Sequence, residues 1–458
     1  MNNKSRRRFL KQSSLAGVGT FIGISHMPFL FAAGSTKAHT AAILGGAQTF
    51  DKLRWIKWPI WIPEQDEKGV LDVLRSGIWS RGGVADEFEK EWAKTLNVKR
   101  CLTVVNGTNA LIVALNQLNV RGGDEVLVTP YTFIATIQAI LANGAMPVFV
   151  DVDPQTFQMD PSNIEEKITS NTKAIMPVHI LGLPCDMDRI MSIAKKHNLI
   201  VIEDACQAPL AEVNHIKVGT IGNAGCFSFQ NSKNIAIGEG GAIVSNDDVF
   251  MDKCFSYHNL GLPYGSAAGI INAGGLIQGT KVRLAEYQAA IGLAQLKRLE
   301  SQTATRNTNA AYLSSLIKNI PGITPYRLYD NVTRAAFHLF PFRYNKNEFK
   351  GLSKAGFIKA LQAEGMPVSG GYTPLNIQPF IKEAFESKNF QKIYAAPRVK
   401  YDKYMEANQC PLNDNLCAEA VWFTQNVLLG SKADMDAVAG MIDKVYTNAE
   451  NIKKAIGK

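Results

Sequence analysis

Residues 227–241 read FSFQNSKNIAIGEGG and contain a lysine in an unusual position. The stretch begins with apolar residues that are typical of a buried strand, and it ends in glycines. Lys233 lies between these two parts, where the expected strand stops. Considered alone, a lysine is best interpreted as a surface residue. A desolvated lysine, however, has a lowered pKa, and its neutral amine can condense with a carbonyl group.

Apolar, strand-like segments alternate with helical patterns from residue 101 to residue 245. This alternation predicts a mostly parallel sheet with helices on both faces. Ligands of such α/β sheets bind at the carboxyl ends of the strands, so the polar residues after each strand are the candidate site. We expect strands at 101–105, 125–129, 147–152, 173–178, 199–203, 225–230 and 241–245, and helices at 110–118, 134–143, 164–168 and 187–196.

The pattern becomes helical from about residue 286, and a smaller α+β region follows. Its expected elements are a strand and two helices, at 337–344, 356–365 and 434–447. We therefore predict a large α/β domain at 58–300 and a small C-terminal α+β domain at 301–458. Residues 35–57 are expected to form a linker that precedes both.

Residues 1–34 have the pattern of an export signal. The basic stretch SRRRFLK precedes an apolar stretch of small residues, as in secretory signals, and its paired arginines before Phe9-Leu10-Lys11 indicate the twin-arginine type. A basic amphipathic helix is the alternative, and His26 and Pro28 argue against an ordinary membrane span. We expect twin-arginine export machinery as a partner and a periplasmic or membrane-anchored protein, with a cytoplasmic location as the alternative.

Composition and charge are those of an ordinary globular protein. The chain has 458 residues, 46% of them hydrophobic, and a formal net charge of +9. Much of that charge lies in the signal segment, and no Lys/Arg run elsewhere resembles a nucleic-acid contact surface. The seven scattered cysteines form no C-x-x-C pair. They predict buried free thiols rather than a metal site or disulfide framework.

Two of the expected strands are followed by residues that suit a phosphate and a flat ring. Gly107 and Thr108 would begin a helix, whose first N–H groups form an anion site, although a plain helix cap is the alternative. Phe133 follows the next strand and lies where an aromatic ring can stack on a planar ligand. Ordinary core packing is the alternative for Phe133.

Two later strands end in residues that suit the chemistry of a heterocyclic cofactor. Asp204 follows four apolar residues, and a buried carboxylate needs a cation or strong donors; a helix-capping aspartate is the alternative. Ser228 precedes Lys233 by five residues and can donate a hydroxyl to a phosphate. Pyridoxal phosphate requires a phosphate-binding site, an aromatic ring that stacks on it, a buried aspartate and a lysine.

The sequence resembles the DegT/DnrJ/EryC1/StrS family of sugar aminotransferases, which are pyridoxal phosphate enzymes of fold type I. The resemblance extends over residues 58 to 445, and its most specific parts are the Ser-x4-Lys–GEGG block and the EDA-x-Q block. It implies an α/β fold with a mostly parallel seven-stranded sheet and a smaller C-terminal α+β domain. The matching segments include NGTNAL, GDEVLVTPYTFIAT, IEDACQAP, GTKVRLAEYQAAIGLAQL and AVWFTQNVLLG.

The resemblance implies roles for individual residues. Lys233 would form the Schiff base with pyridoxal 5′-phosphate, and Asp204 would pair with the pyridine nitrogen. Phe133 would stack on the ring, and Gln207 would lie near the ring oxygen. The phosphate would be held by Gly107, Thr108 and Ser228. The resemblance also implies a homodimer in which each site is built from two subunits.

Two features depart from the family pattern. Lys281, in GTKVR, stands where many members have an asparagine that approaches the cofactor phosphate from the partner subunit. A lysine can still meet a phosphate as a point charge. The export signal is the second departure, since most members are cytoplasmic. His338 and Tyr372 are further candidates for substrate contacts, and no metal site is expected.

We therefore predict an aminotransferase that moves an amino group from glutamate or glutamine to a keto-sugar or keto-cyclitol, with Lys233 as the general base. The branch that it resembles most includes glutamine:scyllo-inosose aminotransferases and 3-amino-5-hydroxybenzoate synthases. A dehydratase or aromatising synthase with the same cofactor is one alternative, and a non-catalytic sugar- or cofactor-binding protein is another. Family dehydratases have histidine at the position of Lys233, so the lysine favours transamination.

Overall fold

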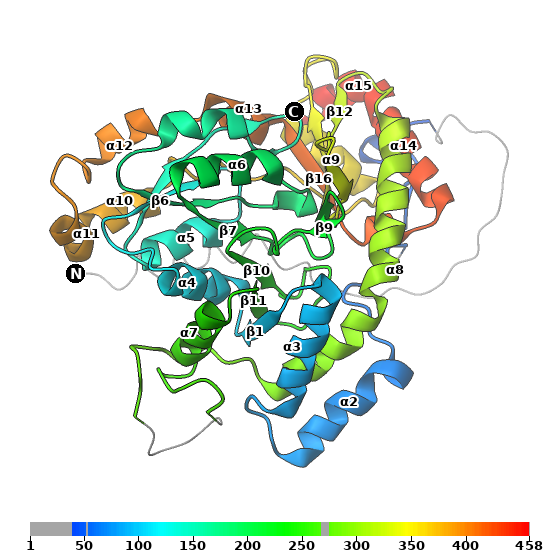
Figure 1. The fold of residues 1–458 in the computed structure, drawn as a ribbon. Coiled ribbons are helices and arrows are strands. Elements are labelled where there is room, and N and C mark those ends of the chain that lie inside the picture. The colour runs from blue at the N-terminus through cyan, green and yellow to red at the C-terminus, as the bar shows by residue number, and fades with distance from the viewer. Residues whose placement is uncertain (1–38, 52–53, 267–273, 458) are drawn as a thin grey trace, which may run out of the picture. The chain divides into compact units, whose positions relative to one another are not determined.

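The computed structural model describes residues 39–51, 54–266 and 274–457. The predicted export signal at 1–34 lies outside the described residues, as does the beginning of the predicted linker. Residues His39–Lys458 belong to one unit, which is drawn in Figure 1.

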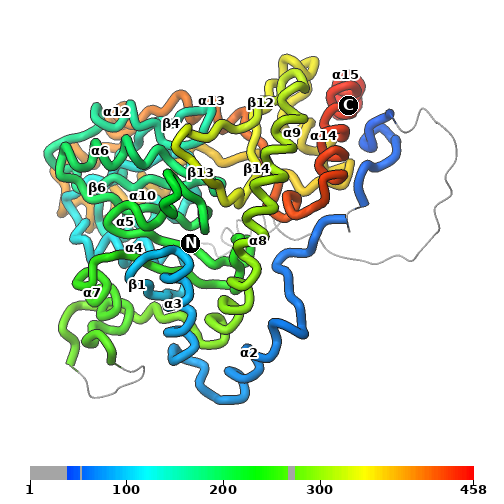
Figure 2. Tube along the Cα trace, turned by 45° about the vertical axis from the view of Figure 1, so that its right-hand side comes forward, coloured from blue at the N-terminus to red at the C-terminus, as the bar shows by residue number. Residues whose placement is uncertain are grey.

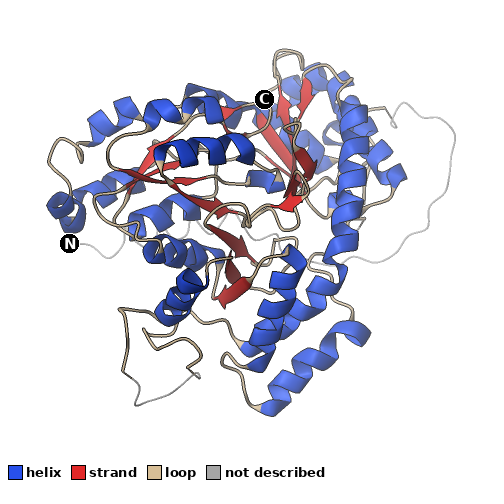
Figure 3. Ribbon diagram, viewed as in Figure 1, coloured by secondary structure: helices blue, strands red, loops and turns tan. Residues whose placement is uncertain are grey.

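A seven-stranded sheet forms the centre of the larger region (Figures 1 and 3). Its order is β1-β11-β10-β7-β6-β2-β3, and β11 alone lies antiparallel to its neighbours. The mostly parallel sheet is therefore confirmed. The strands are β1 (Arg100–Val104), β2 (Glu125–Val128), β3 (Met146–Phe149), β6 (Thr172–Met176), β7 (Ile200–Asp204), β10 (Ala224–Ser228) and β11 (Gly241–Ser245).

Helices cover both faces of this sheet, so its inner strands are buried on both sides. In β7, Val201 packs into one core together with residues of α3 and α6, and Ile202 packs into the other together with residues of α4, α5 and α7. This alternation follows from the period of two along a strand. The helices are α3 (Gly83–Leu96), α4 (Gly107–Gln117), α5 (Ile134–Ala142), α6 (Met187–His197) and α7 (Asp248–His258).

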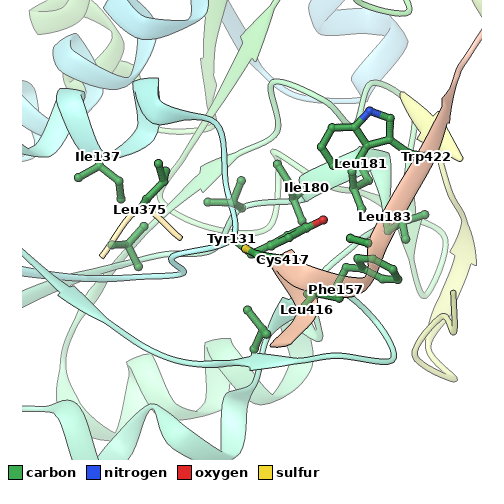
Figure 4. Packing of buried hydrophobic residues seen from close by; sticks show 14 of the residues in the cluster. Tyr131, Ile137, Phe157, Ile180, Leu181, Leu183, Leu375, Leu416, Cys417 and Trp422 are labelled. Carbon is green, nitrogen blue, oxygen red and sulfur yellow. The ribbon is translucent and has the colours of Figure 1, made fainter. Parts of the chain in front are cut away.

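The second of these cores continues into the smaller region, where it surrounds a four-stranded antiparallel sheet. Figure 4 shows part of the junction, where Tyr131 and Ile180 lie near Leu416 and Cys417. The strands are β12 (Ile323–Pro325), β14 (Leu339–Tyr344), β16 (Ala420–Thr424) and β15 (Val368–Ser369), and the helices beside them are α9 (Lys354–Ala363), α14 (Lys432–Thr447) and α15 (Ala449–Ile456).

The longest helix, α8 (Glu286–Ile317), belongs to both regions. It contacts α2 (Pro63–Ser76) and α3 in the large region and α14 in the small one, and Figure 2 shows it between them. The domain boundary predicted at residue 300 thus falls inside an unbroken helix. Helical periodicity does not show which residues of a long helix serve which core.

Three expected elements differ from the structure. The expected strand at 147–152 is split: β3 ends at Phe149, and Val152–Asp153 forms β4, which pairs with β5 (Gln158–Met159). The helix expected at 164–168 is wrong, because Pro161–Asn163 and Glu165–Lys167 form two 3-10 turns. The strand expected from residue 337 begins at Leu339, since Phe337 has a positive φ of 50°.

The remaining elements are short helices at the edge of the large sheet, a further small sheet and three 3-10 turns. Tyr394 and Tyr404 attach the helices after residue 378 to the sheet edge, where their hydroxyls donate to the carbonyls of Gly144 and Pro147, both at 2.8 Å. These helices are α10 (Pro379–Glu386), α11 (Lys388–Ile393), α12 (Tyr401–Ala407) and α13 (Pro411–Glu419). A further sheet contains β8 (Glu212–Val213), β9 (Ile216–Lys217) and β13 (Val332–Arg334), and short 3-10 turns lie at Ala42–Leu44, Ile180–Gly182 and Val427–Leu429.

The cysteine side chains are not joined to one another. All seven are free and five of them are buried, which confirms the predicted free thiols. In the described part of the chain, no helix has the length and apolar character needed to cross a membrane.

Candidate active site

The N-terminus of α4 and the end of β10 meet at the carboxyl edge of the sheet. Asn106 caps α4, and its side chain accepts a hydrogen bond from the Asn109 N–H at 2.9 Å. A Cβ atom on Gly107 would lie 2.8 Å from both the Ser228 Cβ and the Cys206 Sγ, so only glycine fits without displacement. Thr108 follows in the first turn. The predicted phosphate residues Gly107, Thr108 and Ser228 are thus brought together at a helix N-terminus, which favours an anion.

Asp204 is the last residue of β7 and is only 4% exposed. Its Oδ2 accepts the Thr136 hydroxyl at 2.8 Å, and its Oδ1 accepts the Cys206 N–H at 3.2 Å. Among the described residues, no cation forms an ion pair with Asp204. Two neutral donors leave much of the cost of burying a carboxylate uncompensated. A protonated ring nitrogen is therefore a fitting partner. No helix begins after Asp204, because the next element is β8, so the alternative of a helix-capping aspartate is wrong.

Lys233 lies in a turn after β10 and is half-buried. Burial lowers the pKa of its amine, while the nearby Cys206 thiol and Asp204 carboxylate act in the opposite direction. Its backbone is fixed on both sides, because its N–H donates to the Gln230 carbonyl at 2.8 Å and its carbonyl accepts the Trp58 indole N–H at 3.0 Å. The structure thus places a lysine with a depressed pKa near Asp204, as the nucleophile interpretation requires.

The two further substrate candidates come from the small region and its junction. The Gln207 amide donates to the Tyr372 hydroxyl at 2.8 Å, and the Leu181 N–H donates to Gln207 Oε1 at 2.8 Å. Burial raises the pKa of Tyr372 to about 12. His338 is buried; burial, reinforced by Lys233 and Arg306, holds its pKa well below the usual value. His338 is consequently a neutral imidazole close to the lysine.

Two predicted residues lie at the margin of this group. Phe133 caps α5 and is 54% exposed. It lies one turn before Thr136, the donor to Asp204, so it is placed near the carboxylate, and its ring packs into neither hydrophobic core. Lys281 is exposed, and within the described residues its side chain forms no hydrogen bond or ion pair. The chain therefore does not bring Lys281 into the group formed by Gly107, Ser228 and Lys233.

Several residues that shape the site were not predicted. Thr136 orients Asp204, and Cys206 touches both Asp204 and the position of a Gly107 Cβ. Asn234 donates to the Ala336 carbonyl at 2.8 Å, and its Oδ1 lies 3.3 Å from His338 Nδ1. Of these, only Thr136 has a sequence signal, since it follows Phe133 by one helical turn. In the described part of the chain, no group of His, Cys, Asp or Glu residues is arranged to hold a metal ion.

A seven-stranded, mostly parallel sheet with a buried aspartate and a lysine of lowered pKa at its carboxyl edge defines an α/β enzyme of fold type I. Residues 61–398 match the DegT/DnrJ/EryC1/StrS aminotransferase family. The chain belongs to this family and is an aminotransferase.

Known relatives and solved structures agree with this assignment. The chain is 32% identical to an L-glutamine:2-deoxy-scyllo-inosose aminotransferase of Streptomyces kanamyceticus, with 85% of this chain and 93% of the relative covered. It is 35% identical to the spore coat polysaccharide biosynthesis protein SpsC of Bacillus subtilis, over 71% and 85% of the two chains. The solved structure of 3-amino-5-hydroxybenzoic acid synthase is similar, with 30% identity, a TM-score of 0.73 and coverage of 85% and 98%.

The contact between α4 and Ser228 can be tested with Gly107→Ala. The added methyl group has no room and would displace the helix N-terminus. Binding of pyridoxal phosphate to the apoprotein should therefore weaken by a factor of about 5 to 150, the equivalent of an overpacking cost of about 1–3 kcal/mol. Absorbance titration measures the dissociation constant. Gly69→Ala is the matched control, because nothing lies within 4 Å of its Cβ position. Equal affinity of the two variants for pyridoxal phosphate would contradict the proposed phosphate site at the N-terminus of α4.

Proposed function

We propose that this aminotransferase uses pyridoxal 5′-phosphate to move an amino group from glutamine or glutamate to a keto-cyclitol or keto-sugar. The observation that carries the proposal is that Lys233 and Asp204 lie near each other without forming an ion pair. One is an amine whose pKa is lowered by burial, and the other is a buried carboxylate that lacks an ion-pair partner among the described residues. Pyridoxal phosphate, when bound, supplies an aldehyde that condenses with amines and a ring that accepts electrons.

Different residues of the chain would bind different parts of the cofactor. The α4 N-terminus, with Gly107, Thr108 and the Ser228 hydroxyl, would bind the phosphate. Asp204, oriented by Thr136, would keep a proton on the pyridine nitrogen. The exposed ring of Phe133 would stack on one face of the cofactor ring and exclude water from that face.

Proton transfer would be performed by Lys233. Its amine has a lowered pKa, so a larger neutral fraction is present near neutral pH than for an exposed lysine. The neutral Nζ could take a proton from the substrate carbon and return it two bonds away, which is a 1,3-proton shift. His338 is neutral and adds no positive charge that would oppose protonation of Lys233 during this step.

The substrate class is supported by the relatives. The Streptomyces kanamyceticus relative is named for glutamine as amino donor and a deoxy-scyllo-inosose as acceptor, which favours glutamine and a keto-cyclitol for this chain. The Bacillus relative is named for polysaccharide biosynthesis, so a keto-sugar is retained beside the cyclitol. Gln207, Tyr372 and His338 are the polar residues that we expect to face the acceptor.

We also propose a homodimer in which Lys281 of one subunit approaches the phosphate bound by the other. Lys281 is exposed in the single chain and has no partner among the described residues. Large apolar side chains are also exposed on α2 and in the loop that follows it, where they favour an interface. They are Leu71, Leu74, Ile78 and Trp79.

Replacement of Lys233 tests the proposed chemistry. Lys233→Ala should lower transamination by a factor of about 100 to 10,000, because a positioned general base contributes that much. It should also abolish the absorbance band of the Schiff base between the lysine and the cofactor. Lys253→Ala, an exposed lysine on α7, should leave both unchanged. Glutamine or glutamate should bleach the band in the wild-type protein. An unchanged band with each amino donor, or water loss from the keto substrate without amine transfer, would favour the dehydratase or binding-protein alternatives.

A hybrid dimer tests the shared site. Lys281→Glu and Lys233→Ala subunits with different tags are co-expressed and purified through both tags. If Lys281 acts across the interface, the hybrid contains one native site and should show about half the wild-type activity, whereas each homodimeric variant is inactive. An inactive hybrid of dimeric mass would show that both lysines serve the same subunit's site.

The export proposal has its own test. We propose that the chain leaves the cytoplasm through the twin-arginine route, on the basis of SRRRFLK. Joint replacement of Arg6 and Arg7 by lysine keeps the charge but removes the arginine pair that the export receptor reads. The variant should remain in the cytoplasmic fraction, and Arg8→Lys should be exported normally. Wild-type protein found only in the cytoplasm would overturn the proposal.

A further inference from the structure

The segment before the family match is folded against the small region. We call its described residues, 39–51 and 54–58, the N-terminal strap. Those up to residue 57 were expected to form a linker, but the structure shows them packed against the small region. Ala41 is fully buried and Phe50 is 4% exposed, so the strap contributes to the hydrophobic core. It lies before the matched residues 61–398, and the family match therefore does not explain it.

A buried carboxylate anchors the start of the strap. Glu364 is fully buried and accepts the Ala42 N–H at 2.7 Å, the Thr49 N–H at 2.9 Å and the Thr49 hydroxyl at 2.8 Å. Lys444 neutralises it at 3.0 Å. The Phe50 N–H donates to the Glu364 carbonyl at 2.9 Å. A charge with this many donors holds its surroundings firmly.

The middle of the strap is attached through two more side chains. Arg54 Nε donates to Asp434 Oδ1 at 2.8 Å, which joins the strap to α14. The Trp55 indole N–H donates to the Gly365 carbonyl at 3.0 Å. The strap is thus tied to the small region along its described length and reaches the large region in a fixed position.

The end of the strap reaches the catalytic lysine. The Trp58 indole N–H donates to the carbonyl of Lys233 at 3.0 Å, across 175 positions of sequence. It is the same kind of bond, with the same length, as the one from Trp55 to Gly365. Only the bond from Trp58 acts on the backbone that carries the reacting amine.

The face of the same indole meets a buried cation. The Arg306 guanidinium lies 5.4 Å from the Trp58 ring centroid, is fully buried, and donates through Nε to Gln425 Oε1 at 3.0 Å. Arg306 Nη1 has no hydrogen-bond partner among the described residues, and no described carboxylate forms an ion pair with the guanidinium. Burial lowers the pKa of Arg306 to about 9. The indole face therefore contributes to the electrostatic stabilisation of this cation, together with Gln425.

We propose that Trp58 is a positioning residue for the reaction, through which the strap and α8 fix the backbone of Lys233. The edge of the indole holds the Lys233 carbonyl, and the face of the indole is held against Arg306. Rotation of the indole would break both contacts, so the lysine turn is fixed relative to α8. The proposal rests on the proposed role of Lys233 and assigns no contact with substrate or cofactor to Trp58.

Trp58→Phe separates the two contacts, because it keeps an aromatic face for Arg306 and removes the N–H donor to Lys233. The apoprotein is mixed with pyridoxal phosphate, and samples are treated with borohydride at successive times. Borohydride reduces the carbon–nitrogen double bond formed at the lysine and makes it permanent, so the labelled fraction gives the trapping rate. Mass spectrometry locates the label. The trapping rate should fall about five- to tenfold, the effect of one lost hydrogen bond. In the holoenzyme kcat should fall, with KM for glutamine within about twofold.

Trp55→Phe is the matched control, since it removes an equivalent indole bond within the same strap. Both variants should lower the melting temperature by a similar amount, but Trp55→Phe should keep the wild-type trapping rate. Trp58→Leu removes the aromatic face as well and should lower the melting temperature further. Equal trapping rates for Trp58→Phe and Trp55→Phe would overturn the proposal. Label on a lysine other than Lys233 in the wild-type protein would instead overturn the proposed function.

Discussion

The site depends on a buried carboxylate at the end of β7. Two acidic residues follow each other there, and their surroundings differ. Glu203 accepts the N–H groups of Gly219, Ile221 and Gly222 and contacts the His179 imidazole, so its charge is well satisfied. Asp204 receives one hydroxyl and one backbone N–H. The first is a structural residue of the sheet, and the second retains capacity for a cationic ligand.

The close approach around this carboxylate explains the small residues nearby. The α4 N-terminus reaches Ser228 only because Gly107 has no side chain, and Gly241 is likewise crowded by the backbone of Asn106. These contacts join the ends of β1, β10 and β11. They bring a helix N-terminus, a hydroxyl and the lysine turn into one place, while Thr136 brings α5 to the same carboxylate. The electrostatic character of the site is therefore a consequence of how closely its backbones pack.

Much of the large region can be predicted from sequence because its signals are local. Each buried strand is a short apolar run, and the residue after it necessarily lies at the carboxyl edge, so the sequence alone is enough to group Gly107, Asp204 and Lys233. The bond between Trp58 and Lys233 cannot be predicted in this way, since it joins positions 175 residues apart and neither residue type indicates it. The strap has the sequence of a linker for a similar reason: its backbone is held by Glu364, a distant residue of the small region. The 3-10 turns after Asp160 differ from the expected helix because a short apolar pattern does not distinguish the two.

The unbroken course of α8 limits how the protein can move. The helix has 32 residues, a length of roughly 48 Å at 1.5 Å per residue, and it lies in the packing of both regions. A hinge at the expected boundary would require breaking the hydrogen bonds of its central turns, and the core that crosses the junction would have to separate as well. A hinge between the two regions at residue 300 is therefore costly. The two regions are therefore better described as one continuous packing unit than as two domains that rotate about a hinge.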